Sequence, residues 1–201
     1  SWTGPNGFTS TSQSPTISAA TTAASGVYTV SISNGACSAT ATTNVVVDAN
    51  PVSTASNTGA YCEGQQIDLS STGGTTYLWS GPSFSSSAQN PSIPSSTASM
   101  SGVYTVTVTA GTCSSVATTT VTVNPNPTAT AGNTGPYCNG SQINLNETGG
   151  NGASWSWSGP NGFSSSSQNP SIPNGTSAEA GTYTVTVTQS NGCTSSSSCS
   201  A

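Results

Sequence analysis

Apolar and polar residues alternate along several short stretches of the chain, as they do in β-strands with one buried face. The clearest stretch places Tyr104, Val106 and Val108 on one face and the intervening threonines on the other. No stretch shows the helical period of apolar residues. Around this stretch, the same pattern predicts short strands near residues 52–56, 66–70, 76–80, 93, 103–109 and 116–123.

Turn-forming pairs separate the predicted strands. They are Asn-Gly at residues 6–7, 34–35, 161–162 and 191–192, and Gly-Gly at residues 73–74 and 149–150. Glycine and asparagine supply the left-handed backbone conformation that tight hairpins require. Short alternating strands joined by such turns predict an all-β chain folded as antiparallel β-sandwiches.

The chain repeats itself with a period of roughly 76 to 80 residues. A Trp-Thr/Ser-Gly-Pro motif begins at Trp2, Trp79 and Trp157, and a Gly-x-Tyr-Thr-Val motif begins at residues 26, 102 and 181. Prolines near residues 51 and 124–127 mark the junctions. We therefore expect the C-terminal half of a repeat at 1–49, a complete repeat at 50–125, and a repeat lacking its last strand at 126–201.

The charge composition excludes several classes of function. The 201 residues include no Lys, Arg or His and only five carboxylates, for a net charge of -5. Nucleic-acid binding draws its affinity from Lys and Arg, so we expect no nucleic-acid partner. No stretch approaches the ~20 apolar residues that span a bilayer, so we expect no membrane insertion in this region, and any export signal or anchor outside it.

Six cysteines at recurring positions, without histidine or a Cys-x-x-Cys pair, predict disulfides formed in an oxidising compartment. Within each repeat, the cysteine near the start would pair with the cysteine of the later hairpin. This predicts the pairs Cys62–Cys113 and Cys138–Cys193. Cys37 and Cys199 then lack a partner in the sequence given, and would pair with protein outside it, with each other, or with a neighbouring chain.

No catalytic or metal-binding set stands out. The carboxylates Asp48, Glu63, Asp68, Glu147 and Glu179 are scattered, and none forms a dense calcium loop or a repeated carboxylate pair. We interpret them as solvated surface charges, and expect no cofactor, no metal and no enzymatic activity.

Aromatic residues and sequons supply the remaining candidate sites. We expect Trp79 and Trp157 to fill the cores, while Trp155 and its counterpart Tyr77 are candidates for stacking on sugar rings. Asn139, Asn146 and Asn174 begin Asn-x-Ser/Thr sequons and are candidate glycosylation sites.

The Gly-x-Tyr-x-Val-x-Val run resembles the penultimate strand of immunoglobulin-like folds, although Val30, Val106 and Val185 stand where that family usually has its strand cysteine. Together with Tyr-Cys-x-Gly, Trp-Ser-Gly-Pro-Asn-Gly-Phe, Gln-Asn-Pro-Ser-Ile and Asn-Pro-Asn-Pro, it resembles the tandem Ig-like repeats of large Bacteroidetes surface adhesins and gliding-motility filament proteins. The resemblance covers nearly the whole chain and implies a stalk rather than a catalytic module.

These observations favour a structural repeat region of an extracellular filament or adhesin stalk, at the cell surface or in a secreted filament. Its expected partners are neighbouring copies or repeats of the same protein, joined by strand complementation, and surface glycans. The alternative is a carbohydrate-binding accessory region of a secreted enzyme, in which Trp155 and Tyr77 form the stacking platform.

Overall fold

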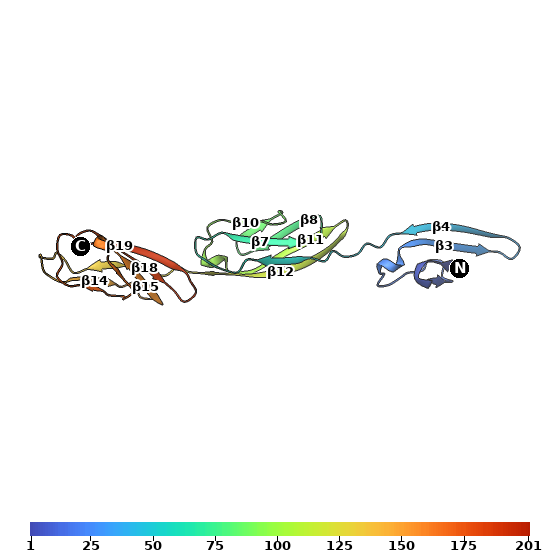
Figure 1. Ribbon diagram of the computed structural model, residues 1–201. Helices are drawn as coiled ribbons and strands as arrows, with labels where there is room; N and C mark the ends of the chain where they lie inside the picture. Colours follow the sequence, from blue (N-terminus) through green and yellow to red (C-terminus); the bar gives the residue numbers. More distant parts are fainter.

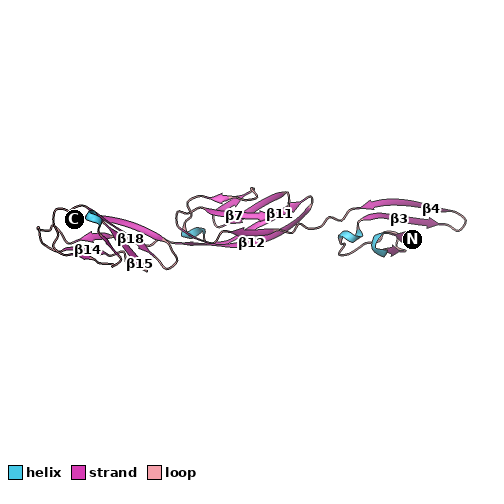
Figure 2. Ribbon diagram, viewed as in Figure 1, coloured by secondary structure: helices cyan, strands magenta, loops and turns pink.

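The computed structural model describes residues 1–201 and is built almost entirely from β-strands. Three bodies lie in a row, the first at the right of Figure 1 and the third at the left. Short 3-10 turns are the only helices (Figure 2), and none of them has the length and apolar character needed to cross a membrane. The fold is a tandem array of Ig-like antiparallel β-sandwiches, as the alternating pattern and the repeat predict.

The first body has a single four-stranded sheet, in the order β2-β1-β3-β4. Because no second sheet covers it, residues that are buried in the second body are more exposed here. Trp2 is half-buried, whereas the corresponding Trp79 is fully buried. Its elements are β1 (Trp2–Thr3), η1 (Pro5–Gly7), β2 (Thr9–Ser10), η2 (Thr22–Ala24), β3 (Gly26–Ser33) and β4 (Ser38–Val45).

The second body is a two-sheet sandwich, with sheet orders β10-β7-β5 and β6-β12-β11-β8-β9. Strand β6 runs parallel to the end of β12, with Cys62 opposite Asn124. The elements are β5 (Thr54–Asn57), β6 (Ala60–Cys62), β7 (Ile67–Thr72), β8 (Thr76–Gly81), β9 (Phe84–Ser86), β10 (Ser92–Ile93), η3 (Ala98–Met100), β11 (Gly102–Ala110) and β12 (Cys113–Asn124).

The third body repeats this plan with sheet orders β13-β14-β17 and β16-β15-β18-β19. Its elements are β13 (Ala131–Asn133), β14 (Ile143–Glu147), β15 (Ser154–Ser158), η4 (Pro160–Gly162), β16 (Ser164–Ser165), β17 (Ser171–Ile172), β18 (Thr182–Thr188) and β19 (Thr194–Ser200). We expected this repeat to lack its last strand, and that detail is wrong. Strand β19 pairs with β18 in full, and is a shorter counterpart of β12.

The cores of the second and third bodies are built from the predicted positions. Tyr104, Val106 and Val108 are fully buried. Trp79 and Trp157 expose at most 1% of their surface. Each of the two tryptophans donates its indole N–H to a backbone carbonyl, at 3.2 Å in both bodies. The tyrosine of each Gly-x-Tyr motif donates its hydroxyl to the carbonyl oxygen four residues earlier, in all three bodies. This is the tyrosine corner of Ig-like folds.

Candidate functional site: the junction between the second and third bodies

A disulfide joins Cys62 of the second body to Cys193 of the third, with their Cα atoms 5.5 Å apart. The bond crosses the junction between two bodies instead of closing one of them. In Figure 1 the hairpin between β18 and β19 reaches back toward the left end of the second body, where β12 leads into the linker. We call this bond the inter-body disulfide.

The expected pairing of Cys62 with Cys113 is therefore wrong. Cys62 lies opposite Asn124, at the end of β12, whereas Cys113 begins that strand. A strand advances about 3.4 Å per residue, so the two cysteines stand roughly 35 Å apart, at opposite ends of the same body. A disulfide requires Cα atoms within about 7 Å of each other.

The same reasoning excludes the expected Cys138–Cys193 bond. Cys193 lies in the hairpin at the start of β19, while Cys138 lines a hollow together with Ser200, at the other end of that strand. The second and third bodies thus each carry their two recurring cysteines at opposite ends. This arrangement favours bonds between successive bodies over bonds within one.

Backbone hydrogen bonds hold the Cys62 side of the junction. The Cys62 carbonyl accepts from the N–H of Gln65 at 3.0 Å and from the Ser96 hydroxyl at 3.1 Å, and its own N–H donates to the Gln65 side chain at 2.8 Å. Gly64 takes a φ of 87°, which a residue with a side chain rarely adopts. A tight, internally bonded loop therefore presents the sulfur.

The Cys193 side is a hairpin tip with its own constraints. Gln189 donates its N–H to the Cys193 carbonyl at 2.9 Å, and the Cys193 N–H donates to the Asn191 side chain at 3.0 Å. Gly192 turns the chain with a φ of 87°. Cys193 is fully buried, and its sulfur is bonded to Cys62 of the second body.

The linker adds a second connection beside the disulfide. The side chain of Asn126 donates to the Glu63 carbonyl at 3.1 Å, and the Glu63 N–H donates to the Asn124 carbonyl at 3.0 Å. Pro127 is buried, which fixes the point where the chain joins the third body. The second and third bodies are thus held at two separate points.

The junction between the first and second bodies has the same hairpin but no disulfide. The thiol of Cys113 contacts the carbonyl of Asp48 in the linker at 3.8 Å. The sequence given contains no first-body counterpart of Cys62, and the Cys113 thiol is free.

Three further cysteines also carry free thiols. Cys37 is exposed at the tip of the β3–β4 hairpin, and Cys138 is exposed at the far end of the third body. Cys199 lies within β19 opposite Tyr183, and packs half-buried against the third core. Cys37 and Cys199 are free thiols in this structure, and what they pair with stays a prediction.

The aromatic candidates for sugar stacking are tied into the sandwiches. Trp155 is half-buried against the third core, and its indole N–H donates to a Glu147 oxygen at 3.0 Å. Tyr77 packs against the second core, and its hydroxyl donates to the Gly74 carbonyl at 2.9 Å. These contacts use the polar atom of each ring, and the sugar-binding role stays a prediction.

Glu147 is a buried carboxylate, which corrects its interpretation as a surface charge. Only 2% of its surface is exposed. It accepts hydrogen bonds from the backbone N–H groups of Thr130 and Gly149 and from the side chains of Trp155 and Gln168. Burial raises the pKa of this carboxyl, but these bonds together outweigh burial and leave the pKa below its ordinary value. No second carboxylate accompanies it, so it stabilises the fold without forming a catalytic pair.

The second charged group with a shifted pKa is Glu179, near the tyrosine corner of the third body. The hydroxyl and N–H of Thr176 and the side chain of Asn161 donate to its carboxylate at 2.7 to 2.8 Å. These bonds lower its pKa to about 2. No group of three or more Cys, Asp or Glu residues lies close enough together to hold a metal ion.

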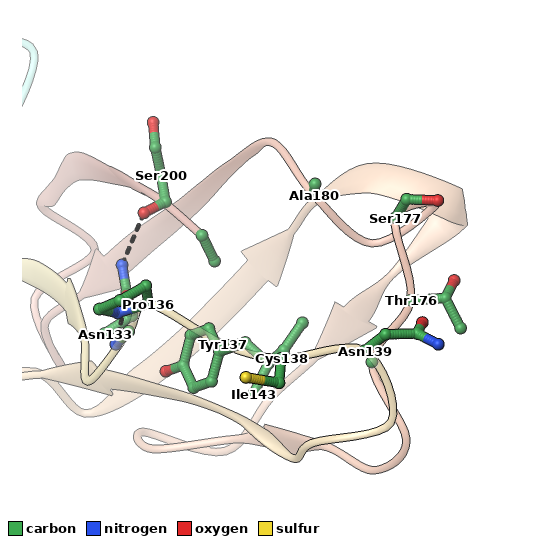
Figure 3. Close-up of a pocket in the computed structure, with 13 residues that line it drawn as sticks. Asn133, Pro136, Tyr137, Cys138, Asn139, Ile143, Thr176, Ser177, Ala180 and Ser200 are labelled. Carbon is green, nitrogen blue, oxygen red and sulfur yellow. Dashed lines mark hydrogen bonds between the residues drawn. The ribbon is translucent and has the colours of Figure 1, made fainter.

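The three sequon asparagines have different surroundings. Asn139 and Asn174 are exposed, which is the condition for attaching a glycan, whereas Asn146 is half-buried within β14 opposite Gly132. Glycosylation at any of them stays a prediction. Asn139 also lines the hollow of about 870 Å³ at the far end of the third body, shown in Figure 3.

No protein-family model matches the chain, and no curated protein sequence matches it. Solved structures do match. Three Ig domains of titin, in an E-to-A mutated variant, share 14% identity over 90% of this chain and 75% of theirs, with a TM-score of 0.50. Sidekick-1 Ig domains 1–5 share 15% over 89% of this chain and 45% of theirs, with a TM-score of 0.36. The similarity to the titin domains supports the Ig-like fold.

Proposed function

We propose that this chain is a non-catalytic structural repeat region of an extracellular filament or adhesin stalk. The inter-body disulfide is the observation that carries the proposal. A bond that fixes one body to the next serves the shape of the array, since the cysteines are placed where they cannot close a single body.

Two connections restrict bending more than one does. A linker alone leaves a body free to swing about its attachment point, whereas a second attachment across the junction removes most of that freedom. At this junction the linker residues 124–127 supply one attachment and the bond between Cys62 and Cys193 supplies the other. The bodies lie in a row (Figure 1), which is the geometry of a stalk.

The same bond supports the proposed compartment. Disulfides persist outside the reducing cytosol, so we place the chain at the cell surface or in a secreted filament. We also propose that the repeats are related to the Bacteroidetes surface repeats that they resemble, and that repeats end after residues 49 and 125.

The first body is the proposed site of strand complementation. The apolar face of its sheet lines a hollow of about 450 Å³ that includes Trp2, Phe8 and Tyr28. In the second body the corresponding face is covered by the sheet of β5, β7 and β10. We propose that neighbouring protein of the same repeat type supplies an equivalent sheet to the first body.

Electron microscopy of the purified chain tests the stalk proposal. We expect rods in which the angle between the second and third bodies varies little. The variant Cys193→Ser should broaden that distribution of angles, and Cys199→Ser, which removes a free thiol from the same body, should leave it unchanged. Equal distributions for Cys193→Ser and the unaltered chain would contradict a stiffening role.

A further inference from the structure

The far end of the third body repeats the cysteine loop that is bonded to the hairpin in the second body. Figure 3 shows Cys138 beside Tyr137 and Ile143, at the edge of the hollow of about 870 Å³. Cys138 follows a tyrosine and precedes a glycine-containing turn, as Cys62 does. In the second body the corresponding cysteine is bonded to Cys193, whereas Cys138 is exposed and free.

The turn after Cys138 has the same hydrogen bond and glycine conformation as the turn after the bonded Cys62. The Ser141 N–H donates to the Cys138 carbonyl at 2.9 Å, matching the 3.0 Å bond from Gln65 to Cys62. Gly140 has a φ of 84°, against 87° for Gly64. The side chain of Asn133 donates to the Ser200 carbonyl at 2.7 Å, as that of Asn57 does to Thr120 at 2.9 Å. The receiving surface is therefore preformed.

The opposite end of the row carries the matching hairpin. The β3–β4 hairpin of the first body points away from the other bodies (Figure 1), with Cys37 exposed at its tip. The Cys37 N–H donates to the Asn34 side chain at 3.3 Å, and the Asn34 N–H donates to the Cys37 carbonyl at 3.1 Å. In the Cys193 hairpin the cysteine N–H likewise donates to an asparagine side chain, that of Asn191, and the cysteine carbonyl accepts from the N–H of Gln189.

We propose that the hollow at Cys138 receives the Cys37 hairpin of a second copy of this chain, and that a Cys138–Cys37 disulfide joins the two copies head to tail. An unbonded cysteine hairpin on the first body and an unbonded cysteine loop on the third body occur on the same chain, so one copy offers what another accepts. Such a contact does not close on itself and extends into a filament. This inference rests on the proposed stalk function and names its partner.

The bond requires an oxidant, and a small-molecule disulfide such as oxidised glutathione supplies it. The thiolate of Cys37 attacks that disulfide, forms a mixed disulfide and releases one thiol. The thiolate of Cys138 then attacks the Cys37 sulfur and releases the second thiol. Two protein thiols are oxidised to one disulfide, and one small-molecule disulfide is reduced to two thiols.

The other two free thiols are less suited to this junction. Cys113 contacts Asp48 within the linker, where the first body is already attached. Cys199 packs half-buried against the third core. Replacing both with serine therefore leaves Cys37 and Cys138 as the only free thiols at the ends of the row.

The test uses the full chain carrying Cys113→Ser and Cys199→Ser, incubated with oxidised glutathione and resolved by mass without a reductant. We expect a ladder of oligomers that a reductant collapses to the single-chain mass of 19.6 kDa. Adding Cys37→Ser in one preparation and Cys138→Ser in another should leave each preparation at the single-chain mass. Mixing the two preparations should give dimers and nothing larger, because each chain then has only one reactive end.

Peptide mapping should find Cys37 bonded to Cys138 in those dimers. Dimers in either preparation alone would show pairing of like ends, and would overturn the inference. Absence of dimers in the mixture would also overturn it, provided that mapping finds the Cys62–Cys193 bond intact. Neither result affects the stalk proposal, which depends on the angle between bodies within one chain.

Discussion

At the scale of single residues, the third body depends on a buried carboxylate that the second body lacks. Ser71 of the second body occupies the place of Glu147, and its buried hydroxyl has no hydrogen-bond partner. Glu147 instead accepts from two backbone N–H groups and two side chains. Glu147 thus holds the turn before β15 by hydrogen bonds, and the Ser71 hydroxyl makes no equivalent bonds in the second body.

Replacing Glu147 with glutamine should destabilise the third body by about 1 to 3 kcal/mol. The amide NH2 would face N–H groups such as those of Thr130 and Trp155, which need an acceptor. Hydrogen exchange of β14 and β15 measures the loss. Asp68→Asn is the matched control, since Asp68 is an exposed carboxylate side chain in the second body, and it should change little. Equal effects from both variants would contradict this account of Glu147.

Acid should weaken the third body through Glu179. Its pKa is lowered to about 2 in the folded state from an ordinary value of 4.5. A lowered pKa stabilises the folded state above pH 4.5, and this contribution disappears as pH falls through 4.5 toward 2. Urea unfolding at a series of pH values measures the decline. The variant Glu179→Gln should flatten the part of the profile that lies between those values, and an unchanged profile would be inconsistent with this role.

At the scale of elements, glycine sets how closely neighbouring segments approach. A Cβ added at Gly149 would lie 2.0 Å from the Thr128 carbonyl oxygen, an overlap with backbone that no side-chain movement relieves. Gly73 has the same relation to Val52 in the second body. The sheet edge of each sandwich therefore requires glycine at this point.

Gly149→Ala should cost about 3 kcal/mol or more, because the backbone at Thr128 must shift. The control is Gly140→Ala, where the φ is 84° but nothing lies within 4 Å of the added Cβ. That change should cost about 1 to 2 kcal/mol, the cost of a left-handed residue with a side chain. Urea unfolding compares the two, and a larger loss at Gly140 would refute the steric argument.

The elements were largely predictable from sequence, and the disulfide was not. Alternation identified β7, β8, β11 and β12, in which every second residue is buried or half-buried, but β6 and β9 are too short to show a period. The predicted cysteine pairs were wrong because pairing depends on which end of the body each cysteine occupies. About ten residues of extended chain separate Pro51 from Cys62, enough to carry that cysteine across the body, away from the hairpin that bears Cys113. Glu147 was missed because burial of a lone glutamate leaves no pattern in the sequence.

At the scale of the whole molecule, stability should be uneven along the row. Val30 is half-buried in the first body, while the corresponding Val106 is fully buried beneath a second sheet. Backbone amides of β3 and β4 should therefore exchange with solvent faster than those of β11 and β12, by at least about ten-fold. Exchange followed by mass spectrometry measures both hairpins in one experiment. Equal protection would mean that the first body needs no complementing sheet.

The inter-body disulfide also determines how tension would pass along the chain. A pull on the two ends travels through the polypeptide to Cys62, across the sulfur bridge, and out from Cys193. The bridged residues lie 131 positions apart, so about 450 Å of unfolded polypeptide stays out of reach of the pull at about 3.4 Å per residue. Most of the second and third bodies is thereby shielded from mechanical extension. Under load these two bodies behave as a connector of fixed length rather than as a spring.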